Sequence, residues 1–174
     1  AYLGTPLVAH GRVIGAISFG TTETESRREY TSADADLADE FARIEDYLAL
    51  MAVRMGPRLT VRIALPDALR GLSVPALLLQ PLVENAIEHG IARRAGAGRI
   101  TIVASRNDDH LELSVTDDGS GLDHSNDFPV EGIGLGNTRR RLAALYGDQA
   151  SLTLNPAPGG GLRVDLVVPL RRAG

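Results

Sequence analysis

From residue 59 onward, the sequence alternates strand-like and helix-like segments in an order that few folds accommodate. The pattern predicts the order β-α-β-β-α-β-β over residues 59–65, 73–90, 99–105, 111–116, 135–146, 151–155 and 162–169. The first helix is expected to open at Ser73-Val74-Pro75, with proline in its first turn, and to end at Gly90. This order indicates an α+β fold: a two-layer α/β sandwich with both helices on one face of an antiparallel or mixed sheet.

A long amphipathic helix is expected before this region. It would start at Thr31-Ser32, with Asp34 and Asp36 in a favourable first turn, and end at Gly56-Pro57. Its apolar residues recur at spacings of four and three, as in a coiled-coil seam: Leu37, Phe41, Ile44, Leu48, Met51 and Met55. Two interpretations stay open. The seam packs on its own domain, or the helix over 37–55 pairs with a second copy in a homodimer.

Composition excludes several classes of chemistry. The 174 residues contain no cysteine, so disulfides, thiol nucleophiles and cysteine-type metal sites are ruled out. All 18 basic residues are arginine, which excludes a P-loop or Schiff-base lysine. The net charge of −4 argues against nucleic acid as a partner. No run approaches the roughly 20 apolar residues of a membrane span. We therefore expect a cytoplasmic location for this piece of a longer chain. That expectation includes the case in which the longer chain is a membrane-anchored receptor.

Asn85 and His89 are the polar residues of interest on the first predicted helix. They lie four residues apart along one edge of its apolar face. The amide oxygen of asparagine is a suitable ligand for Mg²⁺ that already carries phosphate oxygens. Taken alone, such a pair is also typical of a solvated helix edge.

Two glycine-rich segments follow. In the first, Asp117 ends a strand and precedes Gly119 and Gly121, so a carboxylate stands beside backbone that a flat ring can approach. Alone, this pattern is also that of an ordinary turn. The second, Gly132-Ile133-Gly134-Leu135-Gly136-Asn137, leads into a helix whose N-terminal amides could bind phosphate. Its G-x-G-x-G spacing excludes the dinucleotide-binding fingerprint.

In this order and spacing, the three segments resemble the ATP-binding domain of Bergerat-fold (GHKL) proteins. They are most similar to sensor histidine kinases of the LytS type, over residues 37–170. The run from 75 to 90 looks like the N-box of that family, and the two glycine segments look like its first and second glycine boxes. A third glycine region, Gly159-Gly160-Gly161, is followed by Leu162 where the family usually has threonine.

The resemblance implies ATP and Mg²⁺ as cofactors. Asn85 and His89 would be catalytic, with Asn85 the ligand of Mg²⁺, and Asp117 would bind the adenine amino group. Residues 122–131 would form a lid over ATP. The residues expected to bind the cofactor are Glu84, Asn85, Asp117, Gly119, Gly121, Gly132, Gly134, Leu135, Gly136 and Asn137.

The same resemblance implies a function in two-component signalling. The chain would transfer the γ-phosphate of ATP to a phosphoacceptor histidine domain, for relay to a response regulator. Hydrolysing relatives place a glutamate one helical turn before the asparagine, and Pro81, which stands there, cannot activate water. The family's acceptor segment, Pro-His-Phe-Leu-Phe-Asn, has no counterpart among the four histidines. A nucleotide-binding pseudokinase and a serine kinase of the anti-sigma-factor type therefore remain alternatives.

Residues 1–20 predict a β-hairpin, because two apolar runs flank His10-Gly11-Arg12. Residues 3–42 resemble the C-terminal part of a GAF sensor domain, through Pro6-Leu7, Gly11-Arg12-Val13-Ile14-Gly15 and Tyr30-Thr31-Ser32-Ala33-Asp34. Three parts are therefore expected: a GAF-like remnant over 1–36, a connecting amphipathic helix over 37–58 and an ATP-binding catalytic domain over 59–172.

Overall fold

The computed structural model describes residues 4–9, 12–18, 34–93, 96–121 and 133–170. Gly132 and the predicted lid lie outside the described residues, as do two of the histidines, His10 and His124. The chain divides into two compact units, Ala1–Thr31 and Ser32–Gly174. The boundary thus falls five residues before the predicted one at residue 36.

The first unit contains an antiparallel pair of strands, β1 (Gly4–Ala9) and β2 (Arg12–Ser18). Its register runs from Gly4 opposite Ser18 to Ala9 opposite Arg12. The expected hairpin is therefore present, while its assignment to a GAF domain stays a prediction.

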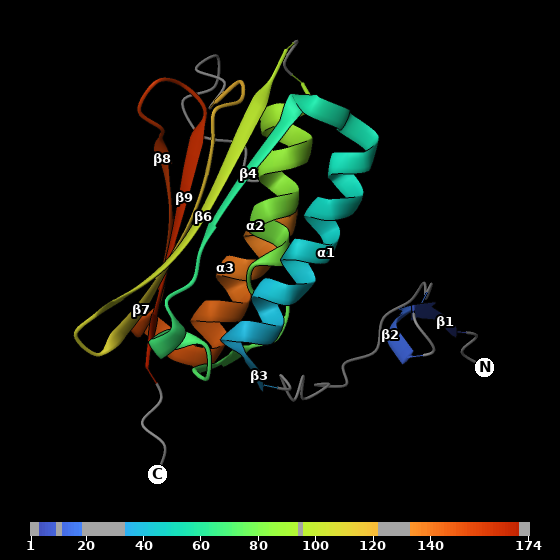
Figure 1. Cartoon of the computed structure of the whole chain (residues 1–174). Helices are drawn as coiled ribbons and strands as arrows, with labels where there is room; N and C mark the ends of the chain where they lie inside the picture. Colours follow the sequence, from blue (N-terminus) through green and yellow to red (C-terminus); the bar gives the residue numbers. More distant parts are fainter. Residues whose placement is uncertain (1–3, 10–11, 19–33, 94–95, 122–132, 171–174) are drawn as a thin grey trace. The chain divides into compact units, whose positions relative to one another are not determined.

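The second unit is built on a five-stranded mixed sheet with strand order β4-β6-β7-β9-β8 (Figure 1). Strand β4 pairs parallel with β6, and every other neighbouring pair is antiparallel. The strands are β4 (Leu59–Ala64), β6 (Gly98–Asn107), β7 (His110–Asp117), β8 (Ser151–Pro156) and β9 (Leu162–Pro169). A sixth and seventh short strand, β3 (Asp34–Asp36) and β5 (Ser73–Pro75), pair with each other outside this sheet.

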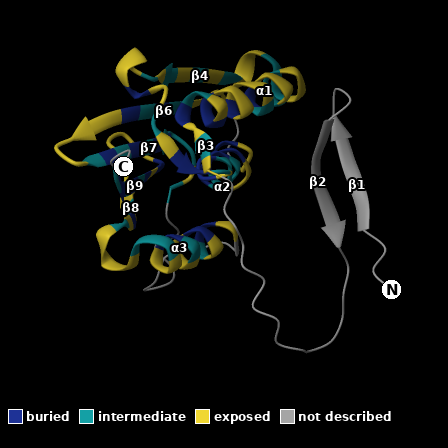
Figure 2. Cartoon of the chain, turned by 90° about the horizontal axis from the view of Figure 1, so that it is seen from below, coloured by how far each residue is buried: buried dark blue, intermediate teal, exposed yellow. Residues whose placement is uncertain are grey.

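Alternation of buried and half-buried residues makes the sheet one-sided. Along β7, Leu111, Leu113 and Val115 are buried, and the residues between them are only half-buried. Because side chains of a strand alternate between faces, this pattern turns one apolar face inward. Buried residues lie on both the sheet and the helices (Figure 2) and form one hydrophobic cluster, and each large buried side chain contributes about 1.5–3 kcal/mol by leaving water.

Three helical elements cover that face (Figure 1). They are α1 (Leu37–Met55), the continuous pair α2 (Gln80–Asn85) and η3 (Ala86–Ile91, a π-helix), and α3 (Ile133–Tyr146). Short 3₁₀ turns, η1 (Gly56–Arg58), η2 (Asp67–Leu69) and η4 (Gly147–Gln149), connect the elements. The predicted two-layer α+β sandwich is confirmed. No helix among the described elements is long and apolar enough to cross a membrane.

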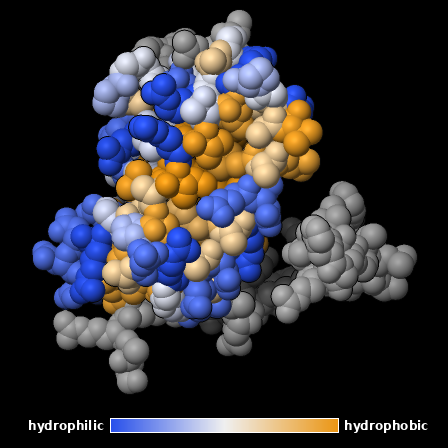
Figure 3. All heavy atoms as spheres, in the orientation of Figure 1, coloured by the Kyte–Doolittle hydropathy of each residue, from blue (hydrophilic) through white to orange (hydrophobic). Residues whose placement is uncertain are grey.

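The seam of α1 faces the core of its own domain. Leu37, Phe41, Ile44 and Leu48 are buried, and both methionines of the seam pack against them. The structure thus favours the first interpretation of the seam. The helical layer also exposes apolar surface (Figure 3), and α1 contributes Leu50 and Val53 on its outward side.

The expected start of α1 was wrong. The helix begins at Leu37, because residues 34–36 are extended and pair with β5 as strand β3. Its first amides are bound by the neighbouring backbone, with Leu37 N–H donating to Leu72 (2.9 Å) and Ala38 N–H to Arg70 (3.0 Å). The predicted side-chain cap is therefore not needed, and Asp36 makes no capping hydrogen bond.

The expected start of the second helix was also wrong. Ser73–Pro75 is strand β5, and the helix begins at Gln80, so Pro81 rather than Pro75 occupies its first turn. The helix does not extend back to residue 77 because Leu77 has a left-handed φ of +58°, and the amides of residues 77–79 are bound by the carboxylate of Glu40. Gly90 does not cap the helix either, since it lies inside η3.

Candidate functional site

The site is organised by a close contact between η3 and the end of β7. A Cβ on Gly119 would lie 2.3 Å from the carbonyl carbon of Gly90, and one on Gly90 would lie 2.4 Å from Oδ1 of Asp117. Both positions therefore require glycine. Ser120 strengthens the contact, because its Oγ donates to the carbonyl of His89 (3.1 Å). The predicted N-box and first glycine box are thus brought together.

Asp117 is the buried carboxylate of this contact, with 3% of its surface exposed. Its Oδ1 accepts the N–H of Gly119 at 2.8 Å. Burial raises the pKa of Asp117, and backbone hydrogen bonds from Gly119 and Leu162 act in the opposite direction. A carboxylate held at the end of a strand in this way can accept a hydrogen bond from an amino group of a ligand.

The third glycine region packs on the same strand end through its backbone. A Cβ on Gly161 would lie 2.0 Å from the carbonyl oxygen of Asp117, and Gly161 has a φ of +89°. Gly121, with a φ of +72°, lies against the carbonyl of Gly161. Leu162 in place of the usual threonine therefore does not prevent this region from packing beside Asp117.

Asn85 and His89 lie where the helix changes type. Asn85 is the last residue of α2 and is half-buried, while His89 is exposed within η3. The π-helix is closed by a hydrogen bond from Ala92 N–H to the carbonyl of Ile87, five residues back (2.8 Å). The residues between Asn85 and His89 therefore depart from the α-helical geometry that the prediction assumed. Short π-helical segments occur frequently at functional sites.

The second glycine box forms the start of α3 and not the loop before it. Gly134, Leu135, Gly136 and Asn137 all lie within the helix, and Leu135 is buried. This corrects the predicted start at Leu135, yet it keeps the glycines in the first turn, where helix amides have no partner within the helix. The first described glycine of the box, Gly134, faces Pro81, because a Cβ added to Gly134 would lie 3.7 Å from the Cβ of Pro81.

Comparison with known proteins identifies the family. Residues 74–172 match the family of histidine kinase-, DNA gyrase B- and HSP90-like ATPases. The chain belongs to this family. Among curated relatives of this ATPase chain, sensor histidine kinase BtsS of Escherichia coli K12 is 36% identical over 135 residues, covering 78% of the chain and 24% of the relative. Sensor protein LytS of Oceanobacillus iheyensis is 28% identical over 147 residues, covering 78% and 25%.

Solved structures agree with this family assignment. The histidine kinase domain of the blue-light activated kinase from Erythrobacter litoralis EL346 superposes with a TM-score of 0.59 at 26% identity. That match covers 78% of this chain and 61% of the other. The predicted resemblance to the ATP-binding domain of LytS-type sensor kinases is confirmed. The chain spans about a quarter of the length of the curated relatives it matches.

Glu84, another predicted site residue, makes a hydrogen bond within its own helix. Its carboxylate accepts a hydrogen bond from Gln80 (2.7 Å). Burial, and then the charges of Glu84 and Glu88, raise the pKa of Tyr47 on α1. A groove of about 620 Å³ lies between α1 and η3, lined in part by Tyr47, Met51 and Glu88, and none of the predicted site residues that the structure describes lines it.

The donor set suits Mg²⁺ bound through a nucleotide. Among the described residues, no group of three or more histidine, aspartate or glutamate side chains could hold a metal by itself. Mg²⁺ commonly takes one or two protein ligands and completes its shell with phosphate oxygens and water. The amide oxygen of Asn85 is suited to be one such protein ligand.

Proposed function

We propose that the chain binds ATP with Mg²⁺ as the catalytic domain of a sensor histidine kinase. It would transfer the γ-phosphate to a histidine on an acceptor domain, from which a response regulator receives it. The observation that supports this function best is the glycine contact between η3 and β7. It holds Asp117 and the helix of Asn85 together with no side chain between them.

Each end of the nucleotide has a matching group in this arrangement. Asp117 offers its buried carboxylate to the adenine amino group, beside Gly119 and Gly121. Asn85 is assigned to Mg²⁺, and the first-turn amides of α3 to the phosphates, since helix N-termini favour anions. His89 is assigned a place beside the phosphates, on the exposed side of η3.

The residue beside the second glycine box, Pro81, favours phosphotransfer over hydrolysis. Pro81 lies against Gly134, and proline can neither accept a proton nor orient a water molecule. Phosphoryl transfer depends mainly on positioning and electrostatics, so such a site is competent once an acceptor docks.

Isothermal titration calorimetry with ATP, with and without Mg²⁺, tests this assignment. Asn85→Ala should lose most of the Mg²⁺-dependent affinity, because it removes the protein ligand of the cation. Asn107→Ala, at the exposed β6–β7 turn, is the matched control and should bind like the wild type. GTP, which presents a carbonyl where ATP has an amino group, should bind at least about tenfold more weakly.

Two results would contradict the proposal. If Asn85→Ala and the wild type bind Mg²⁺-ATP equally, the metal is held elsewhere. If ATP and GTP bind equally, Asp117 does not recognise the base.

A further inference from the structure

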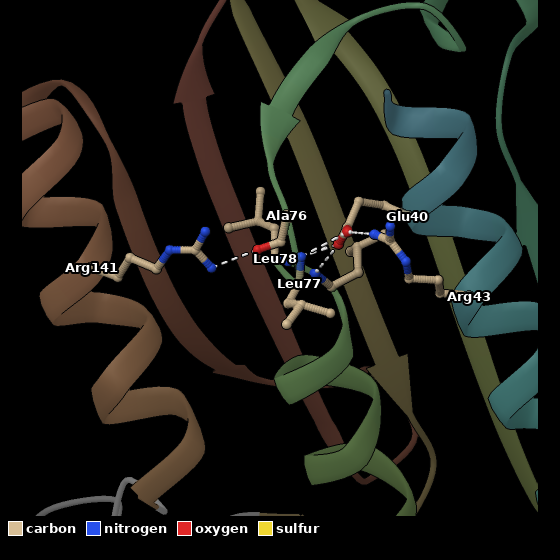
Figure 4. A network of polar contacts seen from close by, with 7 residues as sticks. Glu40, Arg43, Ala76, Leu77, Leu78 and Arg141 are labelled. Carbon is tan, nitrogen blue, oxygen red and sulfur yellow. Dashed lines mark hydrogen bonds and ion pairs between the residues drawn. The ribbon is translucent and has the colours of Figure 1, made fainter. Parts of the chain in front are cut away.

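Glu40 is a buried charge that the nucleotide site does not use directly. It lies on α1 with 2% of its surface exposed, and both carboxylate oxygens point at the segment before α2 (Figure 4). Oε1 accepts the N–H of Leu77 at 2.7 Å, and Oε2 accepts those of Leu78 at 2.7 Å and Leu79 at 3.3 Å. Arg43 donates to Oε1 at 2.8 Å and balances part of the charge.

The three amides form an anion-binding nest. Leu77 has a φ of +58°, a left-handed conformation that is costly for leucine. Successive amides around such a residue converge on one point, where an anion is favoured. The carboxylate of Glu40 occupies that point. It also lies at the positive end of the helix that starts at Gln80, whose N-cap, Leu79, has no capping side chain of its own.

The same segment is held from its other side by α3. Nη1 of Arg141 donates to the carbonyl of Ala76 at 2.6 Å (Figure 4). Strand β3, which leads directly into α1, pairs with Ser73–Pro75 just upstream. Both α1 and α3 therefore contact the short segment 76–79, which directly precedes the helix that carries Asn85.

The two ends of that helix are fixed by different contacts. The end at Gly90 is fixed by Gly119 and Asp117, as described above. The start at Gln80 depends on the amides that Glu40 binds. Asn85 lies between them, five residues after the start.

We propose that Glu40 is a positioning residue for Mg²⁺-ATP: by holding the nest, it places the start of α2 so that Asn85 meets the cation. This inference rests on the proposed function. It adds a separate claim: the position of α1 affects binding at the metal end of the nucleotide more than binding at the adenine end. Linkage requires the reverse as well, so bound Mg²⁺-ATP must strengthen the contact of Glu40 with the nest.

Glu40→Gln tests the inference, because it keeps the size of the side chain but turns one acceptor into a donor that faces backbone amides. The full chain is titrated with Mg²⁺-ATP and, separately, with adenosine. We expect Mg²⁺-ATP affinity to fall at least about tenfold, and adenosine affinity to stay within about twofold. Glu45→Gln, an exposed carboxylate on the same helix, is the matched control and should change neither.

The outcomes separate the two proposals. A wild type that binds no Mg²⁺-ATP refutes the proposed function. A wild type that binds it, together with Glu40→Gln affinities that are unchanged or fall equally for both ligands, refutes the positioning role. If Glu40→Gln does not fold, amide hydrogen exchange on the wild type decides the question. Exchange at Leu77, Leu78 and Leu79 should slow when Mg²⁺-ATP saturates the site, and unchanged exchange there overturns the inference.

Discussion

At the scale of single residues, Asp117 combines a cost in folding stability with the proposed role in recognising adenine. Its carboxylate is buried and accepts the amide of Gly119. Burial raises its pKa, so ionisation of Asp117 is disfavoured in the empty site. A ligand amino group would supply the hydrogen bond that makes this charge less costly.

The pH dependence of stability should reveal this cost. The folded pKa of Asp117 lies above its ordinary value of 3.8, so the folded state binds the proton more tightly than the unfolded state. Stability from this group is therefore present at low pH and is lost as pH rises from about 4 through the folded pKa. Urea denaturation from pH 4 to pH 7 should show this loss in the wild type, and Asp117→Asn should lack it.

The same variant should also fail to bind ATP. The amide of Gly119 would need the single side-chain oxygen of the introduced asparagine, whose NH₂ group would then face donors. A variant that keeps the wild-type pH dependence, or that keeps the ATP affinity, would contradict the assignment of Asp117.

Gly119→Ala should separate η3 from β7. The added Cβ would lie 2.3 Å from backbone carbon of Gly90, and backbone cannot turn aside as a flexible side chain can. We expect a loss of about 1–3 kcal/mol of unfolding free energy, or more, together with loss of ATP binding. Gly71→Ala, where a Cβ meets nothing within 4 Å, should stay within about 0.5 kcal/mol of the wild type. Equal stability of both variants would show that the contact is looser than described.

At the scale of elements, one face of α1 has two functions. Its apolar side chains pack in the core, and Glu40 on the same face binds the amides before α2. Glu40 lies three residues after Leu37 and four before Ile44, so a carboxylate stands within the apolar seam. That break in the pattern was the sequence signal for a buried, partnered charge. It could not name the partner, because the amides of residues 77–79 lie far along the chain and depend on a left-handed leucine.

The five strands of the main sheet were predictable to within one or two residues, because alternation along β7 and β9 is a local property. Strands β3 and β5, and the starts of α1 and α2, were not. Ser73-Val74-Pro75 has the composition of a helix start, yet pairing with residues 34–36 makes it a strand. Within the candidate site, the grouping of Asn85 with Asp117 and Gly119 was predictable from the order and spacing of the motifs. The packing role of Gly90 depends on tertiary contacts and was not predictable.

Leu48→Ala distinguishes the two interpretations of the α1 seam. Leu48 is 2% exposed in the core of its own domain, so the variant should lose about 2–5 kcal/mol of unfolding free energy. Leu50→Ala, at a side chain that is 62% exposed, should change it by less than about 0.5 kcal/mol. Sedimentation should give the same oligomeric state for both variants. Dissociation caused by Leu48→Ala would instead show that the seam pairs with a second copy.

At the scale of the whole molecule, the domain holds a nucleotide site without, among its described residues, a histidine placed to receive the phosphate. Of the two described histidines, His89, on η3, is proposed to bind beside the phosphates and not to accept one, and His110 starts β7, opposite Pro169. Transfer requires an acceptor nitrogen in line with the γ-phosphoryl group. The reaction is therefore expected to need an acceptor domain supplied from elsewhere.

Incubation with γ-labelled ATP and Mg²⁺ checks this expectation. The chain alone should acquire no acid-labile phosphate and should hydrolyse ATP negligibly, because Pro81 cannot activate water. Adding a histidine-containing helical acceptor domain should give labelled acceptor, and Asn85→Ala should abolish the labelling. Acid-labile phosphate mapped to a histidine of the isolated chain would overturn this prediction, and label on a partner's serine would indicate a different class of kinase.

The π-helix η3 makes the number of residues between Leu79 and Gly90 a structural constraint in itself. An α-helix rotates by about 100° per residue, so fixing its rotational phase at one end dictates the phase at the other. Here the amides bound by Glu40 hold the start of the helix, the contact with Gly119 holds its end, and the wider turn of η3 lies between Asn85 and that end. A chain one residue longer or shorter in this interval would keep every chemical group of the site and still present Asn85 and Gly90 in mismatched directions.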